Sequence, residues 1–169
     1  FYQTKGTDLC VVRGTFLKAS ADESLGNQLR QLPAISDVAA VSFDLIELDQ
    51  DNSVFAIGWE DSSYEFSGLK ILQGRRFHGD EAGILLGEIL AADLKYKVGD
   101  TIEIQGVPLQ IVGIFRGGES FETSGVILPL HQLQKISDLG SKVAGFHLRL
   151  RPPVTNQSAE EQFRQVKLM

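Results

Sequence analysis

The sequence predicts an α+β fold in which a discontinuous α/β layer, built from both ends of the chain, carries an inserted small β-rich subdomain. A strand pattern followed by a helix pattern occurs near each end, and the middle holds short alternating strands separated by glycine-containing turns. The 169 residues suffice for one domain or two small subdomains, and 43% apolar with 22% charged residues is typical of globular chains. We therefore expect residues 1–57 and 141–169 to form the layer and residues 58–140 to form the insert.

The chain begins with a predicted strand and a predicted helix. The apolar run Leu9–Val12 is typical of a short strand. Ser20 and Glu23 have the spacing of a capping box, in which each side chain bonds the other residue's backbone amide. We therefore expect a helix to begin at Ser20, with leucines spaced four and three residues apart on one face, and to end before Pro33.

A β-hairpin and a β-rich middle follow. Residues 38–48 and 53–59 form two strand-like runs on either side of a polar turn, which predicts the hairpin. In the middle, residues 69–72 form a short apolar run, and residues 83–86 are predicted as a buried strand or turn. Strands are predicted at 101–104, where the pattern alternates, and at 107–115 and 126–128, with short helices at 88–94 and 130–136.

The last part of the chain repeats the order strand, then helix. Residues 145–151 alternate, with apolar side chains on one face and His147, Arg149 and Arg151 on the other. A second capping box over residues 158–161 predicts a final helix that is still running at the last residue. We therefore expect the chain to be a segment of a longer protein.

Composition and charge exclude several classes of protein. Sixteen Lys and Arg against twenty-two Asp and Glu give a net charge of −6, and the longest basic run is Arg75-Arg76. Nucleic-acid surfaces need clustered basic residues, so this class is disfavoured. The most apolar stretch, residues 83–94, is interrupted by two acidic residues, whereas a membrane-spanning helix needs about 20 mostly apolar residues.

Cysteine and histidine usage gives no metal site. Cys10 is the only cysteine, which rules out an internal disulfide, and its apolar neighbours predict a buried structural thiol. His78, His131 and His147 have no metal-binding spacing with another histidine or carboxylate, so we expect all three at the surface.

The sequence also contains no catalytic motif that we can identify. The Gly-x-Ser-x-Gly nucleophile elbow and the Gly-Lys-Ser/Thr phosphate loop are both missing. Acidic pairs such as Asp61 and Glu65 lie in polar turns, where solvation keeps both side chains ionised. We therefore expect no enzyme activity, no cofactor and no metal, and we favour a binding or mechanical module.

An ordered series of motifs in the middle third carries a resemblance. The series is Gly74-Arg75-Arg76-Phe77, then Leu86-Gly87, an alanine-containing helix at 88–94, Gly99-Asp100, Val112-Gly113-Ile114 and Val126-Ile127-Leu128-Pro129. This order resembles the MacB-like periplasmic core domain of ABC-type permeases of the FtsX-like superfamily. No single motif is specific, and the resemblance rests on their order from about residue 54 to residue 136.

The resemblance implies a fold and a cellular role. In this family the domain is divided into a "porter" part from both ends of the segment and an inserted "sabre" part, which fits the division given above. It lies outside the bacterial inner membrane, between two membrane spans of the permease. The resemblance implies that the domain transmits ATP-driven motion to a periplasmic substrate or adaptor, for export. The implied partners are a cytoplasmic ABC ATPase, a membrane-adaptor protein and a second copy of the permease, with no catalytic residue.

One loop is a candidate partner surface, and other functions stay open. The polar loop at residues 116–124 offers Arg116, Glu119, Phe121 and Glu122, with Phe121 as an aromatic anchor; the alternative is an ordinary solvent loop. A secreted or periplasmic small-molecule-binding domain, with a pocket between the two subdomains, is the second hypothesis for the whole chain. A divergent hydrolase is the third.

Overall fold

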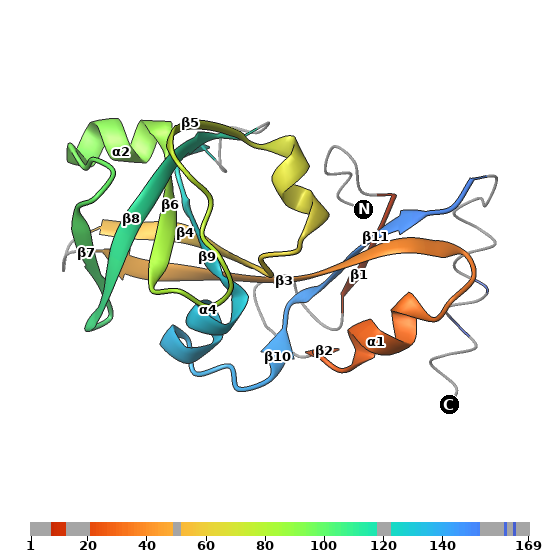
Figure 1. The fold of residues 1–169 in the computed structure, drawn as a ribbon. Helices are drawn as coiled ribbons and strands as arrows, with labels where there is room; N and C mark the ends of the chain where they lie inside the picture. The colour runs from red at the N-terminus through yellow and green to blue at the C-terminus, as the bar shows by residue number, and fades with distance from the viewer. Residues whose placement is uncertain are drawn as a thin grey trace.

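The computed structural model describes residues 8–12, 21–48, 52–117 and 123–152, together with positions 161 and 164. In chain order the elements are β1 (Leu9–Val12), β2 (Ala21–Asp22), α1 (Leu25–Arg30), β3 (Ile35–Leu48), β4 (Asn52–Trp59), the 3-10 helix η1 (Tyr64–Gly68), β5 (Lys70–Gly74), β6 (Gly83–Gly87), α2 (Glu88–Leu94), β7 (Thr101–Ile104), β8 (Val107–Arg116), β9 (Val126–Pro129), α4 (Leu130–Ile136), β10 (Lys142–Val143) and β11 (Gly145–Leu150). Figure 1 shows them along one long strand, β3.

One part of the sheet closes on itself. The pairings β3–β4, β4–β9, β9–β6, β6–β8, β8–β7 and β7–β3 form a circuit, and the last closes through Leu48 opposite Ile104. Alternate side chains of these strands point inward, so the interior is an apolar cluster that includes the fully buried Leu86 and Ile111. The helices α2 and α4 contribute Leu90, Leu133 and other apolar side chains to the same cluster. We call this region the barrel end.

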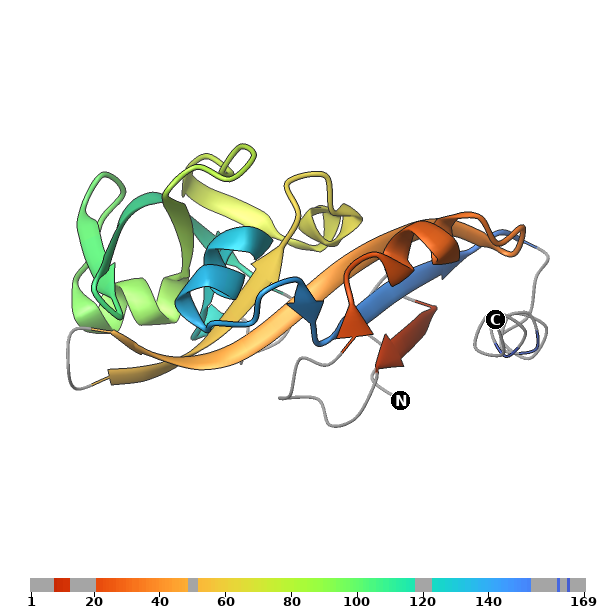
Figure 2. The same cartoon turned by 90° about the horizontal axis from the view of Figure 1, so that it is seen from below.

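The other part is an open layer. There β1 pairs with β11 and β11 pairs with the first half of β3, both antiparallel. The short helix α1 lies on this sheet and buries Leu29 in a second apolar cluster with Phe146 and Leu148. The strand pair β2–β10 lies beside it. We call this region the α1 end; Figure 2 shows it projecting from the barrel end, so the described molecule is elongated.

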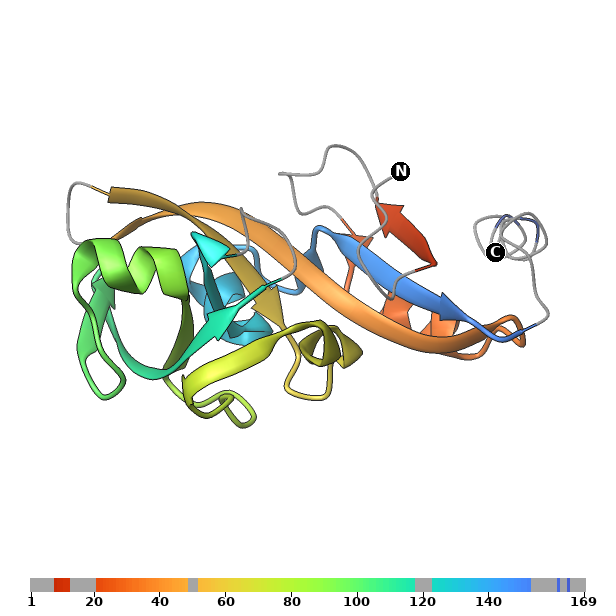
Figure 3. The same cartoon turned by 90° about the horizontal axis from the view of Figure 1, so that it is seen from above.

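The strand β3 belongs to both ends. Its residues 35–41 pair with β11 and its residues 41–48 pair with β4, so Val41 is the position where the partner changes. Figure 3 shows the strand running without a break from the α1 end into the barrel end. At about 3.3 Å per residue, its 14 residues would extend roughly 45 Å. The two ends therefore share one continuous backbone element.

Most of the strand and short-helix predictions are confirmed, and the α+β class with them. The hairpin β3–β4 and the short helices α2 and α4 lie where the sequence placed them, within a few residues. The division of the chain at residues 57/58 and 140/141 stays a prediction. The first of these boundaries falls inside β4, and one sheet contains strands from both predicted parts. The predicted helix over 159–169 and Ser20 lie outside the described residues, apart from positions 161 and 164.

The predicted start of the first helix was wrong. Residues 21–22 form β2, and α1 begins only at Leu25. Asp22 pairs with Lys142 of β10, and its carboxylate accepts hydrogen bonds from the backbone amide and the hydroxyl of Ser24. Glu23 does not cap the helix, because its carboxylate turns toward His131 of α4. Tertiary contacts have overridden the local capping signal.

Candidate functional site

The junction between the barrel end and the α1 end is the candidate functional site. The 3-10 helix η1, yellow in Figure 1, follows β4 and lies beside β3 and β11. It begins at Ser63, whose hydroxyl accepts a hydrogen bond from the amide of Glu65, as a capping serine does. This turn places three consecutive side chains, those of residues 64, 65 and 66, in contact with different neighbours.

The central contact is a buried pair between η1 and β11. The Glu65 Oε1 lies 2.7 Å from His147 Nδ1, and both side chains are less than a tenth exposed. Burial of the ring disfavours its charge and lowers the pKa of His147, but hydrogen bonds to Cys10 and Glu65 outweigh this cost and raise the pKa to about 9. At neutral pH the pair is therefore an imidazolium facing a carboxylate, shielded from water.

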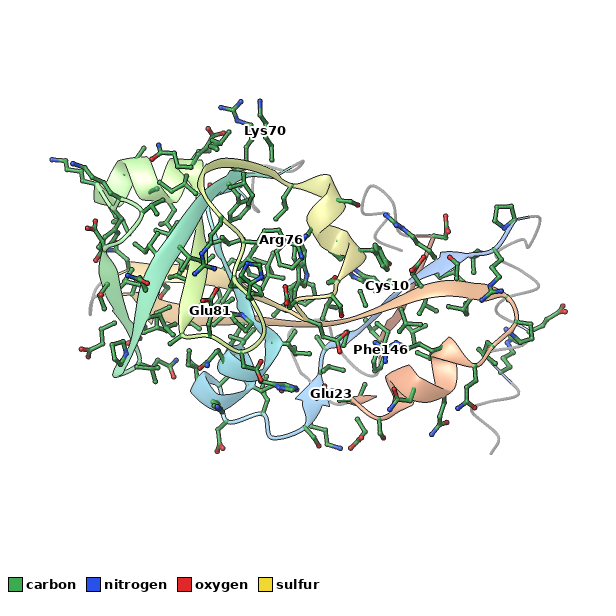
Figure 4. The ribbon with its side chains drawn as sticks, in the orientation of Figure 1. Cys10, Glu23, Lys70, Arg76, Glu81 and Phe146 are labelled. Atoms are coloured by element: carbon green, nitrogen blue, oxygen red, sulfur yellow. The ribbon has the colours of Figure 1, made fainter. Side chains whose placement is uncertain are left out.

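Cys10 is the third member of this group. It lies opposite His147 in the β1–β11 register, and its thiol hydrogen-bonds to the imidazole. The predicted burial of Cys10 among apolar groups was wrong, because the residue is partly exposed and its thiol has a polar partner. Figure 4 labels Cys10 close to η1.

Two arginines fix the neighbouring side chains of η1. Arg149 of β11 places its guanidinium 4.1 Å from the ring centre of Tyr64 and donates a hydrogen bond to Ser67. Arg76, labelled in Figure 4, lies 3.8 Å from the ring centre of Phe66. Such cation–π contacts hold planar groups in one orientation. In this way η1 is joined to both ends, to β11 by Arg149 and to the barrel end by Arg76.

Phe66 anchors η1 in the third apolar cluster of the molecule. Its ring meets those of Trp59 and Phe77 edge to face, at centre distances of 5.2 and 5.3 Å. All three rings are at most 4% exposed. Edge-to-face packing of this kind adds to the area that the rings bury. The aromatic side of η1 therefore belongs to the barrel end, while Glu65 reaches across to the α1 end.

A second, more exposed set of contacts joins the two ends through α4. His131 of α4 lies between two carboxylates, with Nδ1 3.1 Å from Asp80 and Nε2 3.2 Å from Glu23. Hydrogen bonds to Asp80 and Glu23 raise the pKa of His131 above its ordinary value. Gln134 also donates to Glu23. About half of the His131 side chain is exposed, so this contact is weaker than the buried pair.

A cavity of about 290 Å³ lies at the junction. It is lined by Asp22, Glu23, Ser24, Asn27, Arg30, Ala40, Glu60, Ser141 and Phe146. Arg30 and Glu60 form an ion pair at 3.3 Å in its wall. The group of Cys10, His147 and Glu65 has the residue types of a nucleophile, a base and an orienting carboxylate, but none of the three lines this cavity.

The sequence placed the candidate partner surface elsewhere. Arg116 is the last residue of β8 and its side chain is more than half exposed. It forms a bidentate ion pair with Glu88 of α2. Glu119, Phe121 and Glu122 lie outside the described residues, so the proposed surface stays a prediction.

In the described part of the chain, no group of three or more His, Cys, Asp or Glu side chains is placed to hold a metal ion. Within that same part, no helix is both long and apolar enough for a membrane span.

Sequence reasoning missed Glu65 and His147. His147 was expected at the surface, and this was wrong because η1 covers the polar face of β11. The two residues are 82 positions apart, so no local pattern links them. The available signal was the pair of aromatic residues, Tyr64 and Phe66, that flank Glu65 in a segment which otherwise resembles a polar turn.

Comparison with known proteins identifies the family and the fold. A family model described as the MacB-like periplasmic core domain matches residues 2–166. The solved periplasmic region of MacB from Actinobacillus actinomycetemcomitans superposes with a TM-score of 0.74 at 16% identity, over 96% of this chain and 84% of that one. The extracellular domain of the noncanonical ABC-type transporter YknZ from Gram-positive bacteria gives 0.68 at 16% identity, over 82% and 78%. A domain of a putative permease from Porphyromonas gingivalis gives 0.65 at 16% identity, over 96% and 83%. No curated protein sequence matches this chain.

Proposed function

Because the chain belongs to the MacB-like periplasmic core domain family, and is therefore an extracytoplasmic domain of an ABC-type transporter permease, we propose that it transmits ATP-driven motion to a periplasmic substrate or adaptor for export. In this proposal the chain itself is not an enzyme and needs no cofactor. An ATPase on the other side of the membrane supplies the energy, and the domain acts as a lever.

The observation that carries the proposal is the continuity of β3. A lever must pass displacement from one end to the other without absorbing it in a flexible joint. Here β3 is hydrogen-bonded to β11 at the α1 end and to β4 in the barrel end, with no loop between. Interiors packed to native density deform little, so a closed barrel at one end of such a strand favours movement as a body.

The proposal includes three partners. These are a cytoplasmic ABC ATPase, a second copy of the permease, and a periplasmic membrane-adaptor protein. The loop from Arg116 to Ser124 is the candidate adaptor surface, with Phe121 as its anchor. Phe121→Ala should weaken binding of the adaptor to the full-length permease. Unchanged binding would show that this loop is not the adaptor surface.

The transmission of motion can be tested in the full-length permease. A spin label at the exposed Asp93 of α2 in each of two copies would report the distance between the two domains by pulsed EPR. We expect the distance between copies to change by several ångströms when ATP is trapped. The same distance with and without nucleotide would contradict transmission through this domain. The chain by itself should show no ATP binding by calorimetry.

A small-molecule-binding function is the second candidate, because of the cavity at the junction. Its volume of about 290 Å³ is at the lower limit for ligand pockets, which are about 300–1,000 Å³. Ligand pockets are mainly apolar, whereas seven of the nine lining residues here are polar or charged, the exceptions being Ala40 and Phe146. A thermal-shift screen separates the two functions, because a ligand that binds this cavity raises the melting temperature with its concentration.

A further inference from the structure

We infer that η1 is a latch: a segment fixed to the barrel end that holds the α1 end at one angle through the buried Glu65–His147 pair, and whose release lets the two ends change their relative orientation. The contacts alone support this inference about η1. It rests on the proposed function in one respect only, namely that the angle between the two ends matters for a domain that transmits motion.

The first step is that the two sides of η1 are held differently. On the barrel side, Phe66 is buried between Trp59 and Phe77, and Arg76 covers its ring. The contacts described between η1 and β11, in contrast, are made by side chains: Glu65 with His147, and Arg149 with Tyr64 and Ser67. These can separate without breaking a strand pairing, because η1 is not part of the sheet.

The second step is that η1 itself has little internal stability. It is five residues long, and its described backbone hydrogen bonds are local, from Phe66 to Ser63 and from Leu69 to Phe66. A 3-10 helix has poorer hydrogen-bond geometry than an α-helix and seldom runs longer. Its attachment to β11 therefore depends on the side chains that bind it there.

Other contacts also connect the two ends. Apart from β3, the described contacts across the junction include His131 with Glu23, and Arg30 with Glu60, both of which are substantially exposed. Exposed ion pairs contribute little, since water and salt screen them. The Glu65–His147 pair is screened least, because both side chains are buried. Among these polar contacts it is thus the one whose loss should change the junction most, while α4 adds apolar contacts by placing Leu130 in the cluster of the α1 end and Leu133 in that of the barrel end.

A buried charged pair favours two distinct states of the junction. With both partners present, each charge is compensated. With Glu65 neutralised, the His147 ring keeps only its contact with Cys10, and burial then favours either loss of the ring proton or separation of η1 and β11 so that the charge reaches water. Either outcome removes the charged contact that holds η1 against β11. An apolar contact of the same area would weaken gradually, whereas this pair favours either a closed or an open junction.

Hydrogen exchange on the 169-residue chain tests the latch. We expect Glu65→Gln to accelerate amide exchange in residues 61–69 and 145–150 by at least about tenfold, while residues 107–116 in the barrel stay unchanged. Cys10 is the only cysteine, and its thiol contacts His147, so its rate of labelling by a maleimide should rise by a similar factor. Glu103→Gln, which changes an exposed carboxylate on β7, is the matched control and should change neither rate.

Two results would overturn the inference. Unchanged exchange in residues 61–69 would mean that the pair does not hold η1, and equal acceleration along the whole chain would mean that it holds the fold as a unit. If Glu65→Gln does not fold, Arg149→Gln serves instead, since it removes the contacts to Tyr64 and Ser67 and keeps the buried pair. The same segments should then loosen by a smaller factor. Failure of this test leaves the distance measurement between permease copies unaffected, so the two proposals can fail separately.

Discussion

The barrel end closes its strands around an apolar interior, whereas the α1 end is an open layer whose outermost described strand, β1, pairs on one side with β11. In the barrel end, stability comes from packing that surrounds every buried side chain. In the α1 end, one short helix covers one face, and the polar contacts with η1 cover part of the other. The barrel end therefore keeps its shape by itself, while the α1 end depends on the junction for its position.

The largest expected effect is loss of packing inside the barrel. Leu86 of β6 is fully buried in the interior cluster, so Leu86→Ala should lower the free energy of unfolding by roughly 3–4 kcal/mol. Leu29 of α1 is equally buried, but Leu29→Ala should act mainly on local opening of the α1 end. Urea titration gives the free energy of global unfolding and hydrogen exchange gives that of local opening, so the two measurements together separate these effects. Equal losses of global stability would contradict the comparison.

The next effect is a pH dependence located at the junction. The folded pKa of His147, about 9, lies above its ordinary value of 6.5. The stabilisation is therefore fully present below pH 6.5 and is lost as pH rises through about 9. The shift corresponds to about 3 kcal/mol. Urea unfolding of the wild type against His147→Gln, measured at pH 6 and above pH 9, should show this difference only in the wild type. Parallel pH profiles for the two proteins would rule out the buried imidazolium.

A smaller effect is expected where α1 approaches the sheet. A Cβ at Gly26 would lie 2.9 Å from Cε1 of Phe146, a ring that is completely buried. Alanine gains about 1 kcal/mol of helix propensity over glycine, but forcing extra volume into a packed site costs about 1–3 kcal/mol. We expect Gly26→Ala to destabilise the chain by about 1 kcal/mol, with faster exchange confined to the α1 end. Asn27→Ala, at the exposed neighbouring position, is the control. A more stable Gly26→Ala variant would show that α1 can move away from β11.

The smallest effect is expected at the surface of the barrel end. Arg116 and Glu88 form an exposed ion pair, and hydrogen bonding to Arg116 lowers the pKa of Glu88. Because water screens such a pair, Arg116→Ala should leave the melting temperature unchanged within error at 0.15 M salt. A clear drop in the melting temperature would mean that this edge of the barrel depends on polar contacts, as the junction does.

Apolar and alternating runs predicted the barrel strands from sequence because each of these strands has at least one face in the interior. Residues 101–104, for example, alternate between exposed and buried side chains as their pattern indicates. The junction could not be predicted in the same way. The polar face of β11 has the pattern of a solvent-facing strand, and only η1, arriving from another part of the chain, buries His147. The capping box at Ser20 and Glu23 failed for a similar reason, since Glu23 binds His131 instead.

The central claim is that, while η1 is attached to β11, the two ends move as one stiff body. It is tested most directly by spin labels on α1 and α2 of the same domain, introduced as non-canonical amino acids at the exposed Asn27 and Asp93 so that Cys10 stays intact. Pulsed EPR on the full-length permease, nucleotide-free and with ATP trapped, would then give the distance between the ends. We predict one narrow distribution with the same mean in both states. A mean that shifts by several ångströms, or a distribution that broadens when ATP is bound, would contradict the claim.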